Sequence, residues 1–70
     1  MERKYNLEKY DDYLASLMEE AYKQIEKTNH LGLGIALLIR KELRLQYKLG
    51  NISGEERDDI DEYFTEFTKK

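Results

Sequence analysis

The sequence predicts an all-α fold, a small bundle of three helices. Apolar residues recur at steps of three and four along most of the chain, which is the spacing of one face of an α-helix. The 70 residues contain no proline and only four glycines, so little in the composition interrupts helices. Breaks at 28–34 and 50–52 divide the chain into three periodic stretches. Because the connections are short, we expect antiparallel neighbours in an up-down-up order.

The first predicted helix runs from about residue 7 to about residue 28. Its apolar stripe consists of Leu7, Tyr10, Leu14, Leu17, Met18, Ala21 and Ile25. Asn6 is the expected N-cap, because an Asn side chain accepts a hydrogen bond from a free backbone N–H at a helix start. In the segment that follows, Asn29, Gly32 and Gly34 are expected to supply the positive φ values that a reversal needs.

The second predicted helix, residues 35–49, is apolar around much of its circumference. Such a helix is expected to be covered on two sides, as the middle member of a three-helix bundle is. Its two faces are Ala36, Ile39, Leu43 and Tyr47, and Ile35, Leu38, Leu45 and Leu49. Residues 43–49 also alternate strictly between apolar and polar types, which is the pattern of a strand. The residue types are helix formers and no partner strand is visible, so we favour helix.

The third predicted helix, residues 54–68, has the clearest start signal. Gly50 is expected just beyond the end of the preceding helix, and Ser53 and Glu56 match the Ser-x-x-Glu capping box. The apolar side consists of Ile60, Tyr63, Phe64 and Phe67. An alternative arrangement is a helical hairpin with a long first helix that completes its core by dimerisation. In either case we expect a single helical domain over residues 1–70.

The turn before this helix carries a short resemblance. Residues 47–56, Tyr-Lys-Leu-Gly-Asn-Ile-Ser-Gly-Glu-Glu, resemble the helix–Gly–Ile–Ser/Thr–x–Glu–Glu–helix turn of many short bacterial and phage helical proteins. The likeness covers ten residues and concerns turn geometry, so it implies no function.

Composition excludes several classes of site. There is no cysteine, so neither a disulfide nor a thiolate metal site is expected. His30, the one histidine, has no second histidine or cysteine to share a metal, and we expect no metal and no cofactor. The longest run of apolar residues and glycine, Leu31 to Ile39, is less than half of the roughly 20 residues of a membrane helix. The N-terminus lacks the apolar segment of a signal peptide, so we expect a soluble, cytoplasmic protein without membrane contact.

Charge is segregated along the chain, whose net charge is −3. Residues 1–30 carry seven acids and five bases, residues 31–52 one acid and four bases, and residues 53–70 seven acids and three bases. In the last segment the acids form a stripe on the predicted helix, at Glu55, Asp58, Asp59, Glu62 and Glu66. Like charges at these spacings destabilise a helix by a few tenths of a kcal/mol per pair. The stripe is either a solvated face, relieved by neighbouring bases, or a docking surface for a basic partner.

The six tyrosines suggest a second part of this docking surface. Tyr5, Tyr13 and Tyr22 lie outside or at the edge of the apolar stripe of the first helix. Tyrosine is favoured in interfaces because it offers a large contact area with few rotatable bonds. The alternative is that these residues pack along a thin core with their hydroxyl groups in water.

Two other functions are less well supported by the sequence. Arg40, Lys41, Arg44 and Lys48 could contact nucleic acid, but the pI near 5.1 and the apolar faces of this helix argue against direct binding. Paired carboxylates such as Asp58 and Asp59 could act as acid and base only in a pocket that separates their pKa values, and a bundle of this size has little room for one. We therefore expect no enzyme activity.

The sequence thus favours a small acidic protein-binding module. We expect an inhibitor or adaptor of a basic protein, for example one that handles nucleic acid, contacted by the acidic stripe and by the three tyrosines. The alternatives are a homodimeric structural bundle and a small DNA-binding or antitoxin-like regulator.

Overall fold

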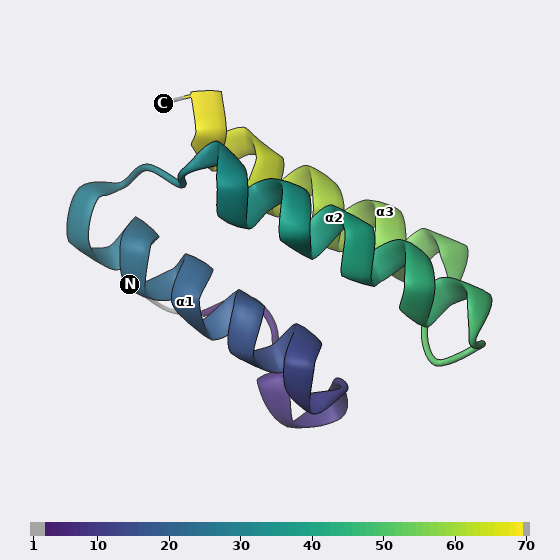
Figure 1. Cartoon of the computed structure of the whole chain (residues 1–70). Coiled ribbons are helices and arrows are strands. Elements are labelled where there is room, and N and C mark those ends of the chain that lie inside the picture. The colour runs from purple at the N-terminus through teal and green to yellow at the C-terminus, as the bar shows by residue number, and fades with distance from the viewer. Residues whose placement is uncertain (1–2, 70) are drawn as a thin grey trace.

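The computed structural model describes residues 3–69, which form three α-helices, two short 3₁₀-helices and no strand (Figure 1). The elements in order are η1 (Leu7–Lys9), α1 (Asp12–Thr28), α2 (Leu33–Lys48), α3 (Gly54–Glu66) and η2 (Phe67–Lys69). In Figure 1, α2 runs back along α1 and α3 returns beside α2. The prediction of a small all-helical fold is confirmed, and residues 43–48 are helical rather than extended.

The first helix begins later than predicted, because a second capping residue intervenes. The Asp11 carboxylate accepts a hydrogen bond from the Tyr13 N–H at 3.0 Å and starts α1. Tyr10, just before it, is extended, with φ −109° and ψ 159°. Asn6 does cap a helix, but its side chain accepts from the Glu8 N–H of the separate turn η1. The single helix predicted for residues 7–28 is therefore two elements.

Only part of the predicted loop geometry is present between α1 and α2. Asn29 has a φ of 57° and ends α1 in the left-handed conformation, as expected. Gly32, however, has a φ of −63° and is the N-cap of α2, and Gly34 lies within that helix. The prediction of positive φ at these two glycines is wrong, because one left-handed residue followed by extended backbone already reverses the chain.

The turn between α2 and α3 follows the predicted pattern closely. Gly50 has a φ of 81°, its N–H donates to the Tyr47 carbonyl at 3.0 Å, and the Asn51 N–H donates to the Gln46 carbonyl at 3.0 Å. This pair of bonds is the Schellman helix stop. The Ser53 hydroxyl then accepts from the Glu56 N–H at 3.0 Å and caps α3. α3 itself ends at Glu66, and residues 67–69 tighten into η2.

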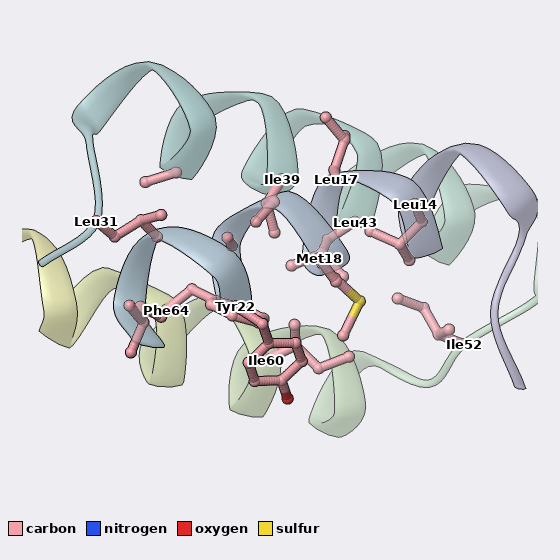
Figure 2. Packing of buried hydrophobic residues seen from close by; sticks show 13 residues of the cluster. Leu14, Leu17, Met18, Tyr22, Leu31, Ile39, Leu43, Ile52, Ile60 and Phe64 are labelled. Atoms are coloured by element: carbon pink, nitrogen blue, oxygen red, sulfur yellow. The ribbon is translucent and has the colours of Figure 1, made fainter. Parts of the chain in front are cut away.

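The core lies between α1, α2 and α3 (Figure 2). Its buried residues are Leu14, Leu17, Met18, Ala21, Tyr22, Ile25, Leu31, Ala36, Ile39, Leu43, Ile52, Ile60 and Phe64. Tyr22 of α1 meets Phe64 of α3 edge to face, with ring centroids 5.3 Å apart. α2 contributes to this cluster from one side only, and its other side stays open to solvent. The prediction that α2 is covered on both sides is wrong, since both of its neighbours pack on the same side.

Residues 3–10, here called the N-terminal strap, cross from α1 to α3. The Tyr5 N–H donates to the Tyr22 hydroxyl at 3.0 Å. The Tyr5 ring packs against Tyr63 at 5.4 Å, nearly perpendicular to it, and against Phe64 at 6.2 Å. Because the strap closes one edge of the aromatic part of the core, it also determines which acids of α3 remain accessible.

Candidate functional site

Three of the five predicted acids of α3 already have a basic partner in the same chain. Asp58 pairs with Arg57 at 3.0 Å, Asp59 with Lys4 of the strap at 3.7 Å, and Glu66 with Lys69 at 3.7 Å. Asp59 also accepts a hydrogen bond of 2.7 Å from the Tyr5 hydroxyl. Exposed pairs of this kind contribute only about 0–1 kcal/mol each, but they reduce the negative charge offered to a partner.

The other two acids, Glu55 and Glu62, are exposed. Among residues 3–69, neither has a cationic group within ion-pair distance. Glu62 borders a shallow depression with Lys4, Tyr63 and Glu66. The acidic stripe is therefore present on α3, but the strap and neighbouring bases divide it into separate, partly compensated groups.

The structure does not bring the three predicted tyrosines together on one surface. Tyr22 is fully buried, and burial raises the pKa of its hydroxyl group. Tyr5 is half-buried against the core, and its hydroxyl is directed to Asp59. Only Tyr13, with 54% of its surface exposed, is available to a partner. Tyr22 occupies the core because the strap and α3 cover the edge of α1 on which it lies.

Glu56, which the sequence marked only as part of a capping box, holds the strap to α3. It accepts a hydrogen bond from the Tyr10 hydroxyl at 3.0 Å and pairs with Lys9 at 3.4 Å. Partial burial, followed by the hydrogen bond to Glu56, raises the pKa of Tyr10 to about 12. The capping motif had assigned this side chain to the backbone of Ser53, so the contact with Tyr10 could be found only from the tertiary structure.

Exposed apolar side chains gather on the outward face of α2. This face is defined here by five exposed leucines. They are, with the exposed fraction of each residue, Leu33 (64%), Leu37 (49%), Leu38 (43%), Leu45 (48%) and Leu49 (62%). Four of them lie in α2 and Leu49 is its C-cap, and the opposite side of this helix packs against α1 and α3. In Figure 1, α1 lies below α2 and α3 lies behind it, and neither passes in front of α2. The sequence showed that both sides of this helix are apolar. The exposed face was not predicted, because both sides were expected to be buried against neighbouring helices.

Bases surround the middle of this face. Leu37 and Leu45 line a shallow open groove together with Arg40, Lys41, Arg44 and Lys48. Arg40 is turned toward α3, where it binds Asp61 at 3.0 Å and Thr65 at 3.3 Å. In the described part of the chain, no carboxylate lies within ion-pair distance of the other three bases. The groove therefore combines an apolar floor with uncompensated positive charge.

Comparisons with known protein families, with curated proteins and with solved structures found no match to this chain. None of the helices within residues 3–69 combines the length and hydropathy needed to cross a membrane. The same residues contain no group of three or more histidine or acidic side chains arranged to hold a metal ion.

Proposed function

We propose that this chain is a non-catalytic protein-binding module, an inhibitor or adaptor, and that it contacts its partner through the outward face of α2. The observation that carries the proposal is the group of five half-exposed leucines on the unpacked side of α2 and at its C-cap. Single exposed leucines are normal on protein surfaces. A group of them on one side of an element, bordered by polar residues, is typical of an interaction site.

The energetics favour a contact that uses both the leucines and the bases. Burying the remaining exposed half of each leucine contributes about 1 kcal/mol, or about 5 kcal/mol for the five. The entropy of association costs at least a similar amount. The leucines alone therefore give weak binding, and the adjacent Lys41, Arg44 and Lys48 must add affinity or orientation. Complementary charge does this chiefly by accelerating encounter and fixing the register of the complex.

A basic partner bound to the acidic stripe of α3 is the second candidate. It is favoured by Glu55 and Glu62, which are exposed and have no base within ion-pair distance among residues 3–69. It ranks below the α2 surface because Asp58, Asp59 and Glu66 have cations of the same chain beside them, and because Tyr5 and Tyr22 use their hydroxyl groups internally.

Capture of partners from native lysate with three forms of the chain tests the proposal. The forms are the natural chain, the double variant Leu37→Ser/Leu45→Ser, and the double variant Glu55→Lys/Glu62→Lys. We expect the leucine variant to lose the partner, with affinity for the purified partner about 10–100-fold lower. The charge-reversed variant should retain it.

Circular dichroism provides the control, because both pairs are exposed and their replacement should leave the helical content unchanged. A partner that binds the leucine variant normally and is lost by the Glu55→Lys/Glu62→Lys variant would reject the α2 surface in favour of the acidic stripe.

A further inference from the structure

We propose that the partner presents an acidic amphipathic helix to the outward face of α2. This inference rests on the proposed function and adds the chemistry of the partner. It is based on one juxtaposition: an apolar groove floor formed by Leu37 and Leu45, and a border on which every charged residue is basic. A helix with leucine-type residues on one side and carboxylates beside them matches both features.

The charge of the groove is available for such a partner. Among residues 3–69, Arg40 alone of the four bases is paired, with Asp61 at 3.0 Å. Lys41, Arg44 and Lys48 have no acidic neighbour within 4.0 Å in the same part of the chain, where every ion pair involves the strap or α3. A protein with a net charge of −3 thus places uncompensated positive charge beside an exposed apolar surface.

The spacing of the groove residues fits a helix as the occupant. Leu37, Lys41 and Leu45 follow one another at steps of four, so they lie in a single row along α2. A second helix packs against such a row at about 8–10 Å between axes. Its own apolar residues at i, i+4 and i+7 would contact the two leucines, and carboxylates on either side would reach Lys41 and the flanking bases.

A second copy of the chain fits this surface poorly. In an antiparallel pairing of two α2 helices about their centre, Leu37 of one copy meets Leu45 of the other. The same arrangement places Lys41 against Lys41 and brings Arg44 and Lys48 of both copies into one interface. Like charges buried opposite one another cost several kcal/mol, so the charge pattern opposes self-association here.

An anionic membrane surface is also less well matched than a single helix. A helix is about 10 Å wide and can occupy the groove alone. A flat bilayer would extend past its border to the adjacent depression, which Asp58 and Asp61 line together with three arginines, Arg40, Arg44 and Arg57. There Arg40 is paired with Asp61 and Arg57 with Asp58, so a flat anionic surface would gain little additional positive charge beyond the groove.

Two synthetic helical peptides test the inference with the full chain. Both carry leucines at i, i+4 and i+7; one has glutamates at the flanking positions and the other has lysines. We expect the glutamate peptide to bind at least about tenfold more tightly at about 50 mM salt, with the difference shrinking toward about 300 mM. Nuclear magnetic resonance should place its contacts on residues 33–49.

A matched pair of variants separates a local effect from the effect of net charge. Lys41→Glu/Lys48→Glu should abolish the preference for the glutamate peptide. Lys23→Glu/Lys27→Glu on α1 changes the net charge equally but should preserve this preference.

The inference is overturned if the lysine peptide binds as well or better, or if neither peptide binds at the outward face. It is also overturned if vesicles of phosphatidylcholine with some phosphatidylserine bind there and the glutamate peptide does not, or if sedimentation shows a dimer that covers the leucines. Any of these results, obtained while a captured partner still requires Leu37 and Leu45, rejects the acidic helix alone and leaves the proposed function intact.

Discussion

At the scale of single residues, the contacts of Glu56 link the N-terminal strap to the helices. Its carboxylate accepts a hydrogen bond from Tyr10 at 3.0 Å and lies 3.4 Å from Lys9. Tyr5 makes the equivalent contact one turn along α3, with Asp59. In both contacts a partly buried tyrosine hydroxyl must keep its proton to donate, and the pKa of each hydroxyl is raised by burial first and by the carboxylate second.

Replacing Tyr10 by phenylalanine should lower the free energy of unfolding at neutral pH. It should also make the free energy of unfolding less sensitive to pH in the alkaline range. Loss of the hydrogen bond to Glu56 costs about 1 kcal/mol. Folding raises the Tyr10 pKa from 10.0 to about 12, so the natural chain has the full benefit below pH 10.0 and loses it as the pH rises toward 12, where the unfolded chain ionises first. The stability difference between the two proteins should therefore shrink across this window, as measured by urea denaturation.

Tyr13→Phe provides the control for this pH series. Tyr13 is 54% exposed and its hydroxyl contacts no carboxylate among residues 3–69, so its removal should leave the profile parallel to that of the natural chain. A difference between Tyr10→Phe and the natural chain that stays constant from neutral pH to pH 12 would contradict the assigned role of the Tyr10 hydroxyl.

At the scale of helices, the ends follow from local side-chain chemistry. Ser53 caps α3 by accepting a hydrogen bond from the Glu56 N–H, and Asp11 caps α1. Gly50, with a φ of 81°, forms the helix stop after α2. The Ser53 and Gly50 signals were readable in the sequence because they depend on residues within a few positions of each other. The break at Tyr10 and Asp11 was not, because the apolar stripe continues through Leu7 and Tyr10, and Tyr10 leaves the helix where its hydroxyl binds Glu56, which is far away in the chain.

Ser53→Ala should destabilise the protein by about 1 kcal/mol, because the Glu56 N–H loses its partner at the start of α3. The matched control is Ser16→Ala in α1. Ser16 is exposed, and its hydroxyl donates to the Tyr13 carbonyl at 3.0 Å within the helix, so alanine should be neutral or slightly stabilising there. Equal losses in the midpoint of thermal unfolding for the two variants would show that Ser53 is not the cap on which α3 depends.

At the scale of the whole molecule, the packing of the helices and of the strap determines which surfaces are exposed and can bind a partner. The sequence predicted three helices and most of the core, because helical periodicity reports which side of a helix is apolar. It could not show that α1 and α3 pack on the same side of α2, which leaves Leu37, Leu45 and their neighbours exposed. It also could not show that Lys4 and Lys9 of the strap compensate acids of α3. Both facts depend on contacts between segments far apart in the chain.

The proposed function requires that the outward face of α2 be open in the free protein and covered in the complex. Leucine methyl spectra recorded with a soluble paramagnetic agent measure this directly, before and after addition of the captured partner. We expect strong relaxation of the methyl groups of Leu33, Leu37, Leu38, Leu45 and Leu49 in the free chain, little relaxation of Leu14 and Leu43 in the core, and selective protection of the five exposed leucines in the complex. Protection of these five leucines in the free chain, or full accessibility of them when the partner is bound, would contradict the assignment of this face as the binding surface.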